Sequence, residues 1–95
     1  MKLGKVVGTV VSTRKDEKLE GLTLQVVHFM DENGELMKDS IVAVDTVGAG
    51  VGEVVLVATG SAARMSRATE GKPIDGTIVS IVDAVDFVGK ARYSK

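Results

Sequence analysis

The chain has 95 residues, enough for one small domain over residues 1–95, and its 12 basic and 13 acidic side chains nearly cancel. It contains no cysteine and one histidine, His28, which excludes disulfides and thiolate metal sites and argues against a histidine-rich metal centre. The balanced charge offers no basic surface to attract nucleic acid or an anionic membrane.

Two features bear on location. The longest uncharged run, Val54–Ala63, is about half of the roughly 20 residues that a membrane-spanning helix requires. The first residues, MKLGKVVG, show no apolar signal core followed by a cleavage site. We therefore expect a cytoplasmic protein with no membrane partner.

The composition favours an all-β fold. Valine greatly outnumbers leucine, and there are 11 glycines and a single proline. Valine is stiff at its first side-chain torsion and suits a pleated backbone, while glycine permits sharp bends. Five strands are predicted in chain order, at Lys2–Val11, Leu22–Met30, about Ser40–Val47, Glu53–Thr59 and Gly76–Val88.

Local signals mark the connections between these strands. Gly4 and Gly8 allow the first strand to coil or another backbone to approach closely. Asn33-Gly34 predicts a hairpin turn. Ser61 is expected to cap a short helix that runs to about Arg67, between the fourth and fifth strands. The predicted fold is a five-stranded OB-like β-barrel with one short helix, although OB folds usually place their helix between strands three and four.

Apolar residues occupy both faces of the third and fifth predicted strands. A small barrel has one interior, so its outer face should be polar. The pattern favours a second buried surface, covered by another copy of the chain. A monomer with some exposed apolar residues is the alternative.

The glycine cluster at Gly48, Gly50 and Gly52 allows two interpretations. A dinucleotide fingerprint would need a third glycine at the sixth position, where this chain has Glu53, and would need a helix where Val54–Val57 read as a strand. The segment GAGVG is therefore predicted to be a structural turn between strands, with positive φ angles supplied by glycine.

No catalytic, cofactor-binding or metal-binding set emerges. Asp83 and Asp86 would point to opposite faces of a strand, so they cannot act as a carboxylate pair unless a bulge intervenes. Asp45 needs a partner such as Arg64 or a turn amide. His28 suits a core or interface position. A small barrel that binds single-stranded nucleic acid or another ligand remains an alternative. Nucleic-acid binding needs stacking aromatics in a basic groove, and the three aromatics lie on separate segments.

Four stretches carry a resemblance to a known family: GKVVGTVVST, LEGLTLQVV, VAVDTVGAGVGEVVLVATGSAAR and PIDGTIVSIVDAV. They resemble the vertex proteins of bacterial microcompartment shells, the EutN/CcmL family, over nearly the whole chain. Ala62 departs from the pattern where many relatives have a second serine.

The resemblance implies a non-catalytic homopentamer that fills the fivefold vertices of a microcompartment shell built mainly of hexameric shell proteins. The residues themselves predict no cofactor and no nucleic-acid partner. The resemblance also implies that Gly60, Ser61 and Arg64 help to set the helix beside a neighbouring subunit. A ring of identical head-to-tail contacts closes without leaving an open edge.

Overall fold

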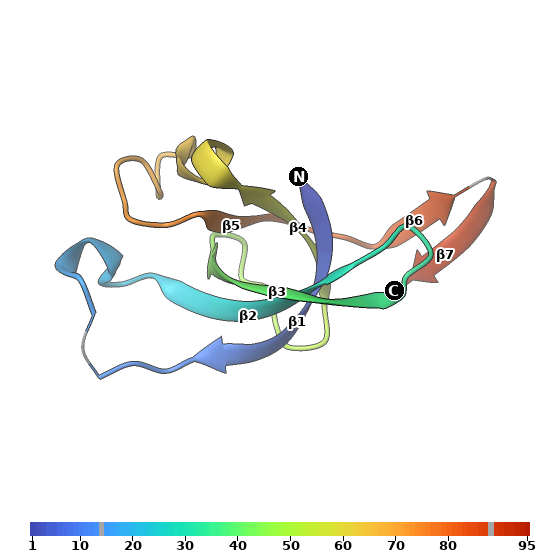
Figure 1. Cartoon of the computed structure of the whole chain (residues 1–95), viewed down its shortest axis with the longest axis horizontal. Helices are drawn as coiled ribbons and strands as arrows, with labels where there is room; N and C mark the ends of the chain where they lie inside the picture. Colours follow the sequence, from blue (N-terminus) through green and yellow to red (C-terminus); the bar gives the residue numbers. More distant parts are fainter. Residues whose placement is uncertain (14, 88) are drawn as a thin grey trace.

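The computed structural model describes residues 1–13, 15–87 and 89–95, and within them the chain is all-β (Figure 1). Two short 3-10 helices, η1 (Glu17–Leu19) and η2 (Gly60–Arg64), interrupt the strands. The strands are β1 (Lys2–Val10), β2 (Thr23–Met30), β3 (Leu36–Asp45), β4 (Val54–Thr59), β5 (Gly76–Ile81), β6 (Ala84–Phe87) and β7 (Lys90–Ser94).

Strands β1 to β5 form a closed barrel in the order β1-β2-β3-β5-β4, with β4 pairing back onto β1. All the pairs are antiparallel except β3 with β5, which run parallel. Closure leaves no free edge in this sheet. The prediction of a five-stranded OB-like barrel is confirmed.

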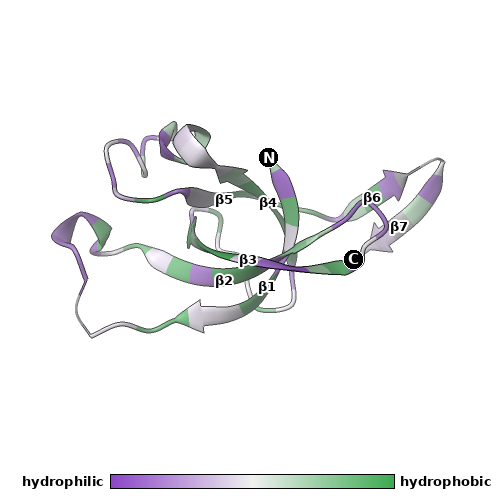
Figure 2. Ribbon diagram, in the orientation of Figure 1, coloured by the Kyte–Doolittle hydropathy of each residue, from purple (hydrophilic) through white to green (hydrophobic). Residues whose placement is uncertain are grey.

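The core lies inside the barrel and consists mainly of small β-branched side chains. Figure 2 shows hydrophobic residues along most of the barrel strands and hydrophilic residues in the loops. These side chains suit the narrow interior of a five-stranded barrel, where bulky residues on every strand would not fit. The core cluster consists of Val6, Val27, Phe29, Ala43, Ala49, Val55, Val57 and Ile78.

The two glycines of β1 serve different purposes. A Cβ at Gly4 would collide with the side chain of Val27 and lie 2.9 Å from the carbonyl oxygen of His28. Gly8 follows an irregularity in the β1–β2 register, where a Cβ would meet nothing within 4 Å. Close approach of the backbones therefore requires glycine at position 4, whereas position 8 has room for a side chain.

The turn predicted at Asn33-Gly34 joins β2 to β3. Gly34 has a φ of 85°, and the Asp31 carboxylate accepts the N–H groups of Asn33 at 2.8 Å and Glu35 at 3.1 Å. Asx turns of this kind are a standard use of aspartate. The turn brings Leu36 opposite Met30, so β3 begins at Leu36, four residues earlier than predicted.

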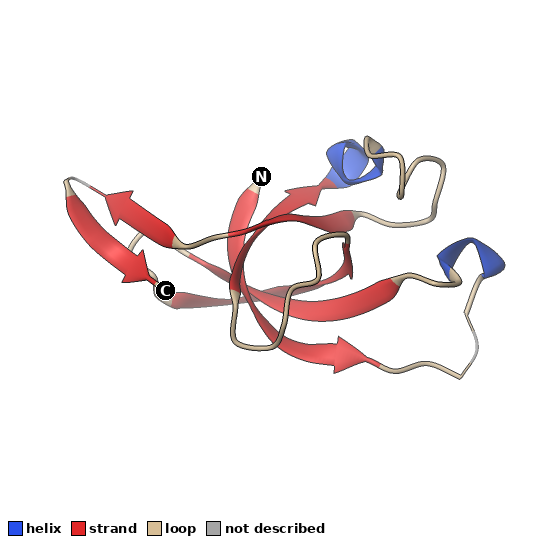
Figure 3. Ribbon diagram, turned by 180° about the vertical axis from the view of Figure 1, so that it is seen from behind, coloured by secondary structure: helices blue, strands red, loops and turns tan. Residues whose placement is uncertain are grey.

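The fifth predicted strand is wrong in its length. It ends at Ile81, and a bend at Val82 and Asp83 leads into β6, which pairs with β7 as a separate two-stranded sheet. Figures 1 and 3 show this hairpin projecting from one end of the barrel. Its partner strand, β7, comes from the polar C-terminal residues 89–95, which were not predicted to form a strand. The predicted end at Val88 lies outside the described residues.

The predicted helix is also shorter than expected. It is one 3-10 segment that ends at Arg64, not about Arg67, and its N-cap is Thr59, which makes no capping side-chain hydrogen bond. Ser61 therefore lies within the helix and does not cap it. Gly60 takes a φ of 62°, which starts the turn directly from the end of β4.

Part of the apolar outer face is buried by the chain itself. Val54 and Val55 are both buried, as are Val57 and Ala58, although consecutive strand residues point to opposite faces. Helix η2 packs against β4 and β5, and Thr77 of β5 donates to the carbonyl of Ala63 at 2.6 Å. Apolar residues on both faces of a strand therefore do not by themselves require a second copy.

Candidate assembly surfaces

The glycine-rich segment connects β3 to β4. Gly48 and Gly52 have positive φ angles of 76° and 95°, whereas Gly50 does not take a positive φ. The expectation that all three glycines supply positive φ is therefore wrong for Gly50. Its N–H donates to the Glu53 carboxylate at 2.7 Å, and this bond closes the turn.

Side chains and backbone from the barrel hold this loop. The Asp45 carboxylate accepts the N–H groups of Val47 and Gly48, both at 3.0 Å. The N–H of Gly52 donates to the carbonyl of Val6 at 2.8 Å. These amides already have acceptors, so they are not arranged to cradle a phosphate. We expected Asp45 to pair either with Arg64 or with a turn amide, and its hydrogen-bond partners are turn amides.

A buried glutamine, absent from the sequence-based candidates, anchors the same loop from inside the barrel. Gln25 is only 4% exposed, and its amide nitrogen donates to the carbonyl of Ala49 at 2.9 Å. Its amide oxygen accepts from the hydroxyl of Thr9 at 2.7 Å. A polar residue with both ends satisfied fixes one loop position without leaving an unpaired group. Its position among apolar residues of a strand was the available sequence signal.

Glu53 also links the loop to the chain's C-terminal hairpin. Its second carboxylate oxygen lies 2.7 Å from the Nζ of Lys95. The hydrogen bond from Lys95, followed by that from Gly50, lowers the pKa of Glu53. The hydrogen bond to Glu53 in turn raises the pKa of Lys95. Because the pair is exposed, we assign it a role in orienting the hairpin and little contribution to stability.

The glycine loop gives a matched pair of substitutions. Gly52→Ala places a Cβ at φ 95°, which should cost about 1–2 kcal/mol and lower the melting temperature by several degrees. Gly50→Ala should change stability by less than about 0.5 kcal/mol, since its nearest contact would be ordinary, 3.5 Å from Glu53 Oε1. Thermal melts at equal concentration measure both, and equal melting temperatures for the two variants would contradict this account.

The segment around η2 holds three residues predicted to lie beside a neighbouring subunit. The N–H of Gly60 donates to the carbonyl of Asp75 at 3.0 Å, and Arg64 donates to the carbonyl of Ile74 at 2.7 Å. Ser61 is exposed. Gly60 and Arg64 thus fasten the long connection after η2 to the end of the barrel, while a role in a subunit interface stays a prediction for all three.

An apolar strip remains exposed on the outside of the barrel. Val26 of β2 pairs with Val42 of β3 on one side and with Gly8 of β1 on the other, next to Val7 at the irregular position. Val7 and Val42 are 42% and 48% exposed, and Val26 is half-buried. Strands β1, β2 and β3 therefore present a row of valines to solvent in the single chain.

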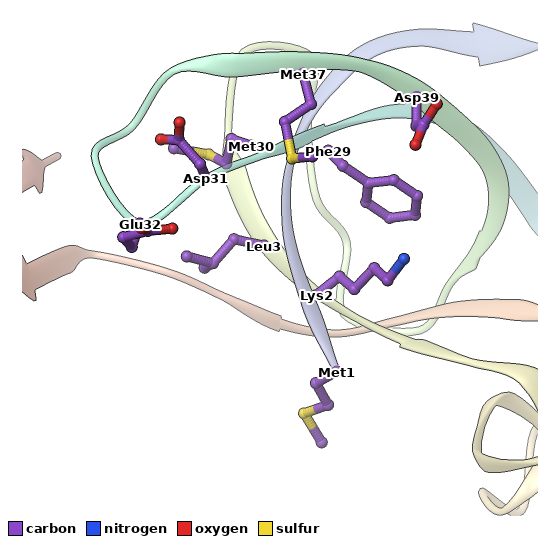
Figure 4. Close-up of a pocket in the computed structure, with 9 residues that line it drawn as sticks. All are labelled: Met1, Lys2, Leu3, Phe29, Met30, Asp31, Glu32, Met37 and Asp39. Carbon is purple, nitrogen blue, oxygen red and sulfur yellow. The ribbon is translucent and has the colours of Figure 1, made fainter.

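A groove of about 420 Å³ opens between the start of β1 and the β2–β3 hairpin (Figure 4). The Nζ of Lys2 lies 4.8 Å from the centroid of the Phe29 ring, a cation–π arrangement at the groove wall. Nothing in the sequence pattern marked this groove, because the pairing of β1 with β2 and of β2 with β3 brings its segments together. It is lined by Met1, Lys2, Leu3, Phe29, Met30, Asp31, Glu32, Met37 and Asp39.

The remaining chemical candidates do not converge. Asp83 and Asp86 are both exposed. Asp83 lies in the bend between β5 and β6 and Asp86 lies in β6, so the two do not share one continuous strand. His28 is half-buried on β2, opposite Lys5 and Ser40. Among the described residues no group of three or more histidine, cysteine or acidic side chains could hold a metal ion. Nor does the described part of the chain contain a helix long and apolar enough to cross a membrane.

The two aromatic side chains that the structure describes do not form a stacking platform. Phe29 is 8% exposed within the barrel core, whereas Tyr93 lies on β7 of the projecting hairpin. The side chain of Phe87 lies outside what the structure describes. The absence of nucleic-acid binding stays a prediction.

The chain matches the family described as "Ethanolamine utilisation protein EutN/carboxysome" over residues 1–83. It is 43% identical over 95 residues to the carboxysome shell vertex protein CcmL of Synechococcus elongatus, covering 100% of this chain and 96% of that protein. It is 51% identical over 90 residues to the microcompartment shell vertex protein GrpN of Rhodospirillum rubrum, covering 93% and 99%.

Solved structures agree with these matches. The structure of CcmL from Gloeobacter violaceus has a TM-score of 0.95 at 39% identity, covering 100% of this chain and 98% of that one. The structure titled "GrpN pentameric microcompartment shell protein", from Rhodospirillum rubrum, has a TM-score of 0.84 at 50% identity, covering 93% and 100%. With agreement in sequence and fold over almost its full length, the chain belongs to the EutN/CcmL family.

Proposed function

We propose that this protein is a structural subunit of a bacterial microcompartment shell, where it assembles as a homopentamer at the shell vertices. The observation that carries the proposal is the match to a pentameric shell protein at 50% identity and a TM-score of 0.84. The exposed valine row on β1, β2 and β3 supports it, because apolar rows of this kind are usually covered in an assembly.

The proposed neighbours of the pentamer are hexameric shell proteins. A sheet of hexagonal tiles is flat, and it closes into a polyhedron only where fivefold units replace sixfold ones. A cyclic ring of head-to-tail contacts provides such a unit and stops at closure. On this account the protein performs no catalysis and holds no cofactor.

The alternative, a small barrel that binds single-stranded nucleic acid, has weaker support. The OB-like strand order is compatible with it, but a binding face would require exposed aromatics along a basic groove. Phe29 is buried, and the side chains that line the groove beside it include three carboxylates and one cationic group, that of Lys2. Carboxylates there would repel the phosphate backbone.

Native mass spectrometry tests the proposed assembly directly. We expect the purified chain at micromolar concentration to give a species of five times the 10.0 kDa chain mass. The physical reason is the apolar outer surface that the isolated chain leaves in water. A stable monomer or dimer under these conditions would contradict the proposal, and another ring size would correct its symmetry.

A further inference from the structure

The hairpin β6–β7 is a separate two-stranded sheet that projects from the barrel (Figure 1). Among the described residues neither strand packs extensively against a barrel strand. The hairpin is fastened at its base, where Lys95 donates its backbone N–H to Asp83 at 2.7 Å and its side chain reaches Glu53. A two-stranded hairpin alone in water is marginally stable, so this one needs a surface to pack on.

One face of the hairpin is suited to burial. Val85 of β6 lies directly opposite Tyr93 of β7, and a pair of a β-branched and an aromatic residue is a stabilising cross-strand combination. Both residues are half-buried in the single chain, whereas Ala84 and Ser94, the next pair, are exposed. Covering Val85 and Tyr93 would remove the largest apolar part of the described hairpin from water.

The groove beside β1 has the complementary chemistry. Its apolar lining includes Phe29 and the exposed Met37, and methionine adapts its shape to a partner. Its rim carries Asp31, Glu32 and Asp39. Residues 84–95 of the hairpin include three cationic residues and one acidic residue, Asp86, so the hairpin carries a net positive charge. The charges of hairpin and groove are therefore opposite in sign.

We propose that the hairpin β6–β7 of each subunit docks in the groove of a second copy of this chain, through Val85 and Tyr93. Among the residues that the structure describes, no hairpin residue lines the groove of its own chain, so the two surfaces do not cover each other. Each chain carries one hairpin and one groove, so a head-to-tail contact uses both and can continue around a ring. The inference rests on the proposed pentamer and specifies which surfaces hold it together.

Cross-linking between two differently tagged chains tests this contact. The natural chain has no cysteine, so thiol chemistry reports only introduced residues. We would co-express Ser94→Cys with Glu32→Cys and separate the pentamers by size, with native mass spectrometry to verify their mass. A short bis-maleimide is then added to the pentamers in solution. We expect a covalent dimer containing both tags. The control pair, Ser94→Cys with Val11→Cys, uses a residue that directly follows β1 and does not line the groove, and it should give no such dimer.

A pair of charge substitutions provides an independent measurement. Tyr93→Asp buries a carboxylate in the proposed contact and should weaken assembly roughly tenfold or more. Val11→Asp also introduces a carboxylate in place of an uncharged side chain, at a residue that is 93% exposed and does not line the groove, and it should assemble as the parent does. Circular dichroism checks that both variants keep the barrel fold.

The outcomes separate this inference from the proposed function. Intact pentamers that give no dimer between the two tags, or that tolerate Tyr93→Asp, would overturn the hairpin contact and leave the vertex function standing. A dimer formed as readily by the Val11→Cys control would also overturn it. If the parent chain forms no pentamer at all, both proposals are wrong.

Discussion

Gly4→Ala is expected to destabilise the barrel by about 1–3 kcal/mol, the range for forcing extra atoms into a packed interior. The added Cβ would collide with Val27 and lie 2.9 Å from the carbonyl oxygen of His28. A side chain can rotate away, but this carbonyl belongs to the β1–β2 ladder and cannot move without opening it. The melting temperature should fall by about 4–8 °C for each kcal/mol. Gly4→Val should prevent folding.

Gly8→Ala is the matched control on the same strand. A Cβ at position 8 meets nothing within 4 Å, and the backbone there does not require positive φ. Alanine also reduces the freedom of the unfolded chain, so the variant should be neutral or more stable by up to about 1 kcal/mol. Because assembly makes melting temperatures concentration-dependent, all variants are compared at one protein concentration. If Gly4→Ala melted with the parent, the close approach of β1 and β2 would not be what requires glycine.

The features that the sequence predicted well are those decided over a few residues. Asn33-Gly34 determines a turn because its conformational needs are local, and the Asp31 side chain completes it. Alternating β-branched residues mark strands for the same reason. The barrel follows from the number of strands and the need to hide their edges.

Gly50 shows where local reasoning ends. Gly48, Gly50 and Gly52 look equivalent in the sequence, yet only the first and last take positive φ. Which glycine does so depends on Asp45 and Glu53, which capture particular amides, and on β1, which accepts the N–H of Gly52. These choices are made by tertiary contacts that no glycine spacing reveals.

The hairpin and the groove were missed for a related reason. Residues Gly76–Val88 read as one long strand because apolar residues continue through the bend at Val82 and Asp83. The pairing of β6 with the polar tail depends on a partner strand that lacks an apolar pattern. The groove joins residues from β1, β2 and β3 that the pairing of these three strands brings together.

Two of the three residues that the family resemblance assigned to a subunit interface have roles within a single chain. Gly60 and Arg64 make hydrogen bonds within their own chain, to the carbonyls of Asp75 and Ile74. Those bonds explain both residues without a neighbour. A contact with a second subunit would be an additional role, and the shape of the segment 60–75 is already determined inside one chain.

Removing the protein from its host is expected to change the shape of the shells and leave the chemistry of their contents in place. A vertex subunit occupies only the fivefold positions, so it should be a minor component of the shell. Without it, hexameric sheets can still form, but they lack the units that close them. Electron microscopy should then show elongated or open shells, and the encapsulated enzymes should remain active when assayed in lysate.

Restoring the parent chain should restore closed, isometric shells, while a chain carrying Tyr93→Asp should not if the hairpin contact holds the ring together. The lysate assay is the decisive control, because it measures the enzymes without any requirement for an intact shell. A structural subunit can affect the retention of contents and intermediates but not the turnover of released enzymes. Closed, isometric shells together with lost enzyme activity in lysate would refute the structural function and require a catalytic or regulatory one.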